Sequence, residues 1–209
     1  IVAAGLLGLL MGMPTLRLRA DYLAIATISV AEIVRVVINS SRTQSVTGGP
    51  IGITGVAADF YAINPIPPGR YGWGSLTYNQ NTLFTMIVGW TLVALACALI
   101  WSLTRSPWGR LLKAVREDEE ATRALGKNVF AMKLQAFVIG SVIGGMAGIL
   151  FTFDGGFVNP TFFVAQTTFN WYLVVILGGV ATVFGPPVGA IAFWFIVATL
   201  NALLTQAIG

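Results

Sequence analysis

The sequence predicts an all-α fold, a polytopic transmembrane helical bundle with a short cytoplasmic helical elbow between two of its spans. Of the 209 residues, 56% are hydrophobic and only 10% are charged, whereas soluble domains have about 25% charged residues. Residues 155–209 contain no charge, so lipid is their expected surrounding. The chain has no histidine and a single cysteine, Cys97. These counts exclude a disulfide framework and a histidine or multi-cysteine metal site.

Apolar runs define the expected helices. A helix needs about 20 residues to cross roughly 30 Å of hydrocarbon, and four runs fit or nearly fit this length, at residues 20–39, 82–104, 134–153 and 188–205. We expect residues 1–13 to be part of a span that the start of the sequence truncates. The run 171–184 would form only about 21 Å of helix. This helix therefore starts earlier, near Gln166, or re-enters the membrane on one side.

The basic residues predict the orientation of the spans. Seven of the twelve lie between residues 105 and 133, and Arg17 and Arg19 lie just before the second apolar run. Because basic residues accumulate in cytoplasmic loops, both places are expected to be cytoplasmic. Residues 40–81, rich in Gly and Pro, then form an outer loop. We expect residues 1–209 to be one membrane domain, incomplete at both ends, with a cytoplasmic loop at 105–133.

The cytoplasmic loop has signals for two short helices. Ser106-Pro107 is typical of a helix start, and this first helix is expected to end near Arg116. Four acids, residues 117–120, favour the start of a second helix, and Gly126 can end it in the left-handed conformation. We interpret such an ordered charged elbow as a docking surface. The alternative is a basic strip that binds anionic lipid headgroups, although the interleaved acids would weaken that attraction.

Residues 109–126 of this loop resemble the cytoplasmic loop of LivM-type permeases of branched-chain amino acid ABC importers. Within them, Glu120-Ala121-Thr122 and then Gly126 resemble the EAA loop of ABC import permeases, with Thr122 at a position where alanine is usual. Blocks at 16–27 and 47–53 are similar to the same family. The resemblance implies a set of residues that couple to an ATPase: Glu117, Asp118, Glu119, Glu120, Ala121, Arg123 and Gly126.

Two charged residues are expected inside the membrane. Glu32 and Arg35 are three residues apart in the run 20–39, so they share a helical face and can pair. They either line a translocation path, where they would meet the charges of an amino acid, or form a structural ion pair, which we favour. Gly48 and Gly49 lack the Lys-Ser/Thr ending of a phosphate loop and are expected to form tight turns at the mouth of the path.

Three glycines in the run 134–153, at four-residue spacing, predict a flat helix face for close packing against another helix or a partner subunit; they are Gly140, Gly144 and Gly148. Aromatic residues of the outer loop are expected to form an interfacial belt, or else a surface for an external partner; they are Tyr61, Tyr71, Trp73 and Tyr78.

The resemblance implies a transport subunit of the bacterial plasma membrane for branched-chain or other neutral amino acids, with urea or short amides as alternative substrates. Its implied partners are two cytoplasmic ATP-binding subunits, a second homologous permease subunit, an external solute-binding protein and membrane lipid, and no nucleic acid. We expect no catalytic residue, metal or cofactor. An ion-gradient-driven secondary transporter is the alternative from another class, and a membrane-embedded enzyme is disfavoured because only Glu32 would be available at depth.

Overall fold

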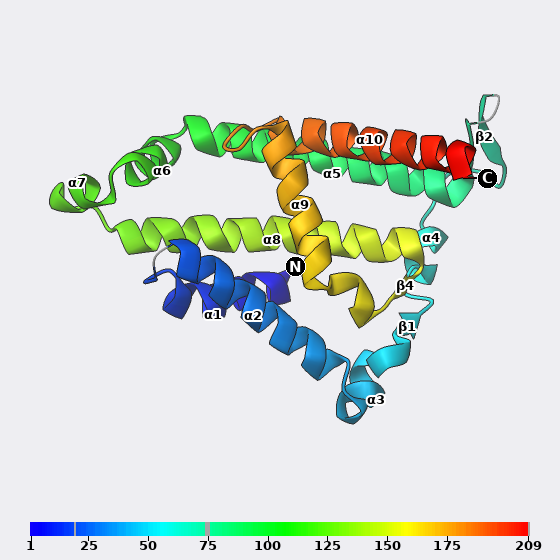
Figure 1. The fold of residues 1–209 in the computed structure, drawn as a ribbon, viewed down its shortest axis with the longest axis horizontal. Coiled ribbons are helices and arrows are strands. Elements are labelled where there is room, and N and C mark those ends of the chain that lie inside the picture. Colours follow the sequence, from blue (N-terminus) through cyan, green and yellow to red (C-terminus); the bar gives the residue numbers. More distant parts are fainter. Residues whose placement is uncertain (19, 74–75, 209) are drawn as a thin grey trace.

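The computed structural model describes residues 1–18, 20–73 and 76–208. Arg19 and the side chain of Trp73, both used in the sequence analysis, lie outside this description. The chain is mostly helical (Figure 1), in agreement with the all-α prediction. Its main helices are α1 (Val2–Thr15), α2 (Ala20–Ile38), α5 (Gln80–Arg105), α6 (Pro107–Glu117), α7 (Glu119–Ala124), α8 (Val129–Gly155), α9 (Ala165–Gly178) and α10 (Gly185–Ile208).

Three of the four expected spans are single long helices. Helices α5, α8 and α10 are long and apolar enough to cross a membrane, and they run in roughly the same direction in Figure 1. The fourth span, α2, is bent by 64° where it meets the helical segment Ser41–Thr47. Helix α1 has 14 residues, or about 21 Å at 1.5 Å per residue, so it does not cross by itself.

Helix α9 overlaps the run 171–184 and has 14 residues, so its length of about 21 Å equals the length expected of that run. It begins at Ala165 and ends at Gly178, so the helix starts earlier than residue 171. Figure 1 shows α9 lying across the direction of the long helices. It packs against α10 at backbone contact, because an added Cβ at Gly189 would lie 2.0 Å from the carbonyl oxygen of Val174 and 2.7 Å from the amide nitrogen of Gly178. Only glycine permits this approach.

Glycines of both helices bring α1 close to α8. An added Cβ at Gly8 of α1 would lie 2.5 Å from the hydroxyl oxygen of Ser141, and one at Gly145 would lie 2.5 Å from the Cβ of Ala4. An added Cβ would meet no atom of the described chain within 4 Å at any of Gly140, Gly144 and Gly148. Packing of these three glycines against a partner subunit stays a prediction.

The segment of residues 40–73 and 76–79 holds elements that the sequence analysis did not predict. It holds α3 (Gln44–Thr47), α4 (Ala58–Ala62) and the antiparallel hairpin of β2 (Arg70–Trp73) and β3 (Leu76–Asn79). Strand β1 (Ile53–Thr54) pairs antiparallel with β4 (Phe157–Val158), which follows α8. The segment is therefore fastened to the end of α8 that lies far from α6 and α7 (Figure 1).

Tyr61 also makes contacts within the chain, while its place in an interfacial belt stays a prediction. Its hydroxyl donates a hydrogen bond of 2.8 Å to the carbonyl oxygen of Phe153 in α8 and lies 3.4 Å from the hydroxyl of Thr85 in α5. The neighbouring Phe60 ring stacks on the ring of Phe153, with the centroids 4.5 Å apart. Tyr61 thus links α4 to two long helices.

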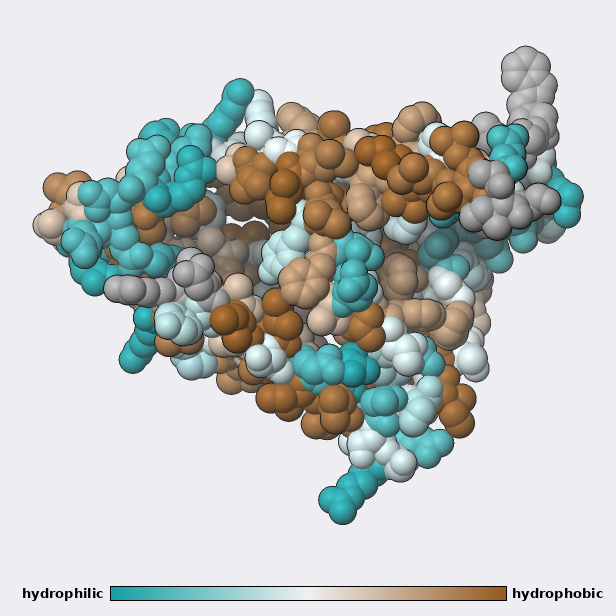
Figure 2. Space-filling view, viewed as in Figure 1, coloured by the Kyte–Doolittle hydropathy of each residue, from teal (hydrophilic) through white to brown (hydrophobic). Residues whose placement is uncertain are grey.

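The surface of the long helices is apolar. Figure 2 shows apolar side chains along α5 and α10 and polar side chains over α6 and α7. The exposed apolar side chains on these two helices include Trp90, Leu95 and Phe195, at 54%, 60% and 71% exposure. Such a surface requires lipid or other helices as its surroundings. Several buried hydrophobic side chains lie instead beside the elbow, namely Val115, Val129 and Met132.

Candidate functional site

The first elbow helix, α6, is fixed against α5. Its start follows the predicted chemistry, since the Ser106 hydroxyl accepts a hydrogen bond from the amide of Gly109 and Pro107 is the first helical residue. An added Cβ at Gly109 would lie 2.4 Å from the carbonyl oxygen of Leu103, so the corner between α5 and α6 requires glycine. The indole of Trp108 donates a hydrogen bond of 2.8 Å to the side chain of Gln135 in α8. Helix α6 is therefore held by both long helices.

The second elbow helix, α7, begins at a cap that Asp118 provides. Its carboxylate accepts a hydrogen bond of 2.9 Å from the amide of Ala121, and its carbonyl accepts one of 2.8 Å from the hydroxyl of Thr122. The Thr122 side chain is buried, with 4% exposure, and a buried hydroxyl needs a partner. This bond explains how threonine is accommodated at the position where the EAA loop usually has alanine.

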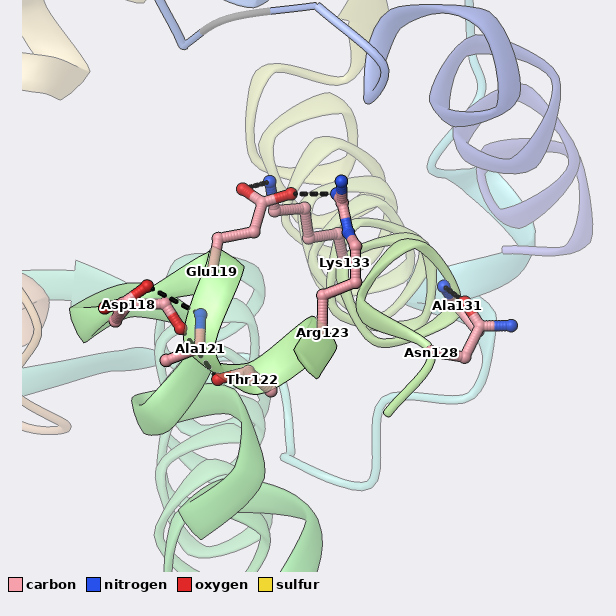
Figure 3. A network of polar contacts seen from close by, with 8 residues as sticks. All are labelled: Asp118, Glu119, Ala121, Thr122, Arg123, Asn128, Ala131 and Lys133. Atoms are coloured by element: carbon pink, nitrogen blue, oxygen red, sulfur yellow. Dashed lines mark hydrogen bonds and ion pairs between the residues drawn. The ribbon is translucent and has the colours of Figure 1, made fainter. Parts of the chain in front are cut away.

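Glu119 joins α7 to α8 (Figure 3). Its carboxylate forms an ion pair of 3.0 Å with Arg123, one turn further along α7, and a second ion pair with Lys133 in the first turns of α8. The Lys133 side chain is 30% exposed and the Glu119 side chain 39%. One carboxylate thus bridges two basic groups on different helices.

The end of α7 is also as predicted. Gly126 has a φ of +74° in the left-handed region, and its amide donates a hydrogen bond of 2.9 Å to the carbonyl of Arg123. Two residues later, the side chain of Asn128 accepts a hydrogen bond of 3.0 Å from the amide of Ala131 and caps α8. The turn between α7 and α8 is thus fully specified by its backbone bonds.

The predicted coupling residues divide into two groups. Asp118, Glu119, Arg123 and Gly126 form the bonds that build the elbow. The remaining side chains, those of Glu117, Glu120 and Ala121, are exposed. Sequence reasoning missed Leu125 as a site residue. This leucine is 78% exposed at the tip of a charged segment, and an isolated apolar residue among charges was the signal that could have identified it.

The two intramembrane charges pair with each other, as expected from their spacing. The Arg35 Nε donates a hydrogen bond of 2.8 Å to Glu32 Oε2, and a second contact joins the same groups. Arg35 lines an apolar hollow of about 550 Å³ between α1, α2 and α8. Thr27, Thr47 and Ser141 provide its hydroxyl groups. Glu32 lines a separate hollow of about 170 Å³ beside α9, so the pair lies between the two.

Gly48 and Gly49 form tight turns beside the larger hollow and are not among the residues that line it. Their φ values are +72° and +54°. An added Cβ at Gly48 would lie 2.2 Å from the carbonyl oxygen of Gly52. Nearby, the side chain of Asn159 donates a hydrogen bond of 3.0 Å to the carbonyl of Pro50, which fastens this turn to the segment after α8.

A family model described as branched-chain amino acid transport system / permease component matches residues 1–208. The chain belongs to this family. This permease component is a multi-pass membrane protein, and the matched range includes both the elbow and the hollow beside Arg35. Both features therefore belong to the domain that defines the family.

The permease component is 37% identical over 194 residues to the high-affinity branched-chain amino acid transport system permease protein LivM of Escherichia coli (strain K12), with 88% of this chain and 45% of that protein covered. The probable branched-chain amino acid transport permease protein LivM of Methanocaldococcus jannaschii is 28% identical over 200 residues, with 92% and 53% covered. The autoinducer 2 import system permease protein LsrC of Photorhabdus laumondii is 28% identical over 117 residues, with 55% and 35% covered. No solved structure matches. The chain spans about half the length of the LivM relatives.

In this permease component the elbow is fastened to both of the long helices that flank it. In the described residues no group of three or more Asp, Glu, Cys or His side chains is placed to hold a metal ion. The two elbow helices form a projecting surface on which Glu120 and Leu125 are exposed. These helices are fixed to α5 and α8. A force applied to that surface would reach two long helices.

Proposed function

We propose that the chain is part of the translocation unit of an ATP-driven importer for branched-chain or other neutral amino acids in a bacterial plasma membrane. It would form the path and perform no covalent chemistry, while two separate ATP-binding subunits hydrolyse ATP. The observation that supports this most is the elbow of α6 and α7, with Glu120 and Leu125 exposed on a body that is fastened to both long helices.

The elbow is the proposed docking surface for an ATP-binding subunit. Leu125 would enter an apolar pocket of the partner, because an exposed apolar anchor surrounded by polar residues is typical of a binding hot spot. Glu117 and Glu120 would form the charged rim. Closure of the two ATP-binding subunits would move the elbow as a unit, and α5 and α8 would follow, as in a rigid-body switch between two states.

The orientation follows from the same proposal. The elbow, residues 105–133, would lie in the cytoplasm, and residues 40–81 would face the outside, where a solute-binding protein delivers the substrate. A second homologous permease subunit would complete the path, and Gly140, Gly144 and Gly148 would offer it a flat face, since their Cβ positions meet no atom of the described chain.

The substrate path would pass the hollow beside Arg35. Its apolar walls suit a branched side chain, and its hydroxyl groups suit the polar end of an amino acid. The ion pair within α2 supports the structural reading of Glu32 and Arg35, because each charge already neutralises the other. Because the pair lies between the two hollows, the guanidinium of Arg35 would lie near the carboxylate of an amino acid that moves along the path. Gly48 and Gly49 would shape the outer mouth.

The choice of substrate rests on the relatives. Those that cover most of this chain are named as branched-chain amino acid permeases, while the autoinducer 2 and fructose permeases match shorter parts of it. Specificity would lie mainly with the external binding protein.

Reconstitution tests the proposal. The natural full-length protein is placed in proteoliposomes with its co-purifying subunits and binding protein, and uptake of labelled leucine is measured with ATP inside. Uptake that requires ATP, and exceeds uptake of urea and fructose, is expected. Uptake driven by an ion gradient in the absence of any ATP-binding subunit would identify a secondary transporter and contradict the proposal.

A further inference from the structure

A third hollow, separate from the two beside Arg35 and Glu32, lies where the elbow meets the long helices. It has a volume of about 800 Å³. Three elements form it: the end of α1 with the residues that follow, helix α7 and the start of α8. The residues that line it are Leu16, Arg17, Leu18, Glu119, Arg123, Phe130 and Lys133.

The charges of this hollow favour an anion. Three basic side chains and one acidic side chain line it, so positive charge remains after Glu119 has paired with Arg123 and Lys133. The guanidinium of Arg17 lies 5.6 Å from the centroid of the Phe130 ring, a cation–π distance. Among the ion pairs of the side chains that the structure describes, none involves Arg17.

The same hollow is partly apolar and lies at the level of the membrane surface. Leu16, Leu18 and Phe130 contribute its apolar wall. Lys133 is the last charged residue of α8 before an uncharged run that reaches Asp154, so it marks the point where α8 enters hydrocarbon. Basic and apolar groups side by side at this depth match the headgroup and glycerol region of a phospholipid.

We propose that this hollow binds the headgroup of an anionic phospholipid, whose phosphate contacts Arg17 and Arg123 and whose glycerol and upper acyl chains lie on Leu16, Leu18 and Phe130. Bound there, the lipid bridges the end of α1 to α7 and braces the elbow. An acidic segment of a partner protein is the competing occupant, but the outward residues Glu120 and Leu125 are not among those that line the hollow. The lipid proposal requires only that the chain spans a membrane.

The test compares lipid retention in the full-length protein, purified from vesicles of phosphatidylcholine and phosphatidylglycerol and analysed by native mass spectrometry. The variants are Arg17→Gln, which breaks no ion pair of the described chain, and Arg123→Gln. Lys113→Gln is the matched control, because Lys113 is an exposed basic residue of the same elbow that does not line the hollow. Each of the first two changes is expected to lower phosphatidylglycerol retention roughly five-fold, from the contribution of one basic residue near a headgroup, with no loss for Lys113→Gln.

Three results would overturn the proposal. Equal phosphatidylglycerol retention in Arg17→Gln and in the unchanged protein would show that the hollow is not the site. Displacement of the lipid by inorganic phosphate at low concentration would identify a site for a soluble anion. Loss of ATP-binding-subunit association in Arg17→Gln, with lipid retention unchanged, would assign the hollow to a protein partner. Leucine uptake is measured separately, so failure of the transport proposal leaves this test intact.

Discussion

Glu119 is the residue on which the joint between α7 and α8 depends most. Its carboxylate is bonded to Arg123 on its own helix and to Lys133 on the next. Exposed ion pairs contribute about 0–1 kcal/mol each to folding, so this bridge adds little to overall stability. Its importance is mechanical, because it restricts how α7 can turn relative to α8.

We therefore expect Glu119→Gln to leave the protein folded but to weaken coupling. Substrate-stimulated ATP hydrolysis by the reconstituted complex should fall several-fold, while the midpoint of thermal unfolding changes little. Lys133→Gln should have the same effect, and the double variant should be no worse than either single one, since all three lose one shared interaction. Strictly additive losses would show that the two residues act separately.

The ends of the elbow helices were predictable from single residues, because a helix start or end depends on local backbone bonds. Ser106 and Gly126 hold the helix start and helix end that their residue types favour. The burial of Thr122 and the exposure of Leu125 were not predictable, because both depend on how α7 lies relative to α6 and α8. A six-residue helix has no clear apolar face from which to infer that position.

At the scale of elements, glycines decide how closely helices meet. Gly109 closes the corner between α5 and α6, where an added Cβ would approach the carbonyl of Leu103 to 2.4 Å. Backbone atoms cannot move aside as the end of a flexible side chain can, so a larger residue must shift α6.

Gly109→Ala is expected to destabilise the protein by about 1–3 kcal/mol, as overpacking does. It should also lower ATP-coupled transport by more than the loss of folded protein explains. Gly89→Ala is the matched control on the same helix, because an added Cβ at Gly89 would meet no atom of the described chain within 4 Å. Thermal unfolding in detergent and leucine uptake are the two measurements. Equal behaviour of the two variants would show that the corner is not tightly packed.

The pair α9 and α10 makes the second prediction at this scale. Gly189→Ala should separate the two helices, because the new methyl group would lie 2.0 Å from the carbonyl of Val174. A loss of about 1–3 kcal/mol is again expected, seen as a lower midpoint of thermal unfolding than that of Gly89→Ala. A midpoint unchanged from the parent protein would contradict the close approach of these helices.

Elements with strong sequence signals were predicted better than those without. The long apolar runs became α2, α5, α8 and α10, and the two elbow helices begin and end near the expected residues. The strands were missed, because two-residue strands such as β1 and β4 form only when distant segments meet. The contact between α1 and α8 was not predictable for a similar reason: spacing shows which residues share a face, whereas the meeting of Gly8 with Ser141 and of Ala4 with Gly145 depends on where α1 lies.

For the whole molecule, charge and hydropathy together define a topology that can be measured. The basic elbow is expected inside and the hairpin end outside. In a Cys97→Ser background, Ser41→Cys should react with a membrane-impermeant maleimide in intact cells, since residue 41 is exposed. Lys113→Cys should react only after the membrane is opened. The reverse labelling pattern would invert the proposed orientation.

The described chain also leaves large apolar surfaces on its long helices. Part of this surface is expected to face lipid and part to face other helices of the transporter, a division that a single chain does not reveal. The elbow is different, because polar side chains cover its surface (Figure 2).

The central claim is that the elbow receives force from an ATP-binding subunit, and crosslinking tests it most directly. A photoreactive amino acid is placed at position 125 in the assembled transporter, and at Leu99 of α5, 46% exposed on the apolar surface, as the control. We predict that position 125 crosslinks to an ATP-binding subunit, with a yield that changes during ATP turnover, and that position 99 does not. Crosslinks from position 125 to lipid alone, throughout turnover, would contradict the claim.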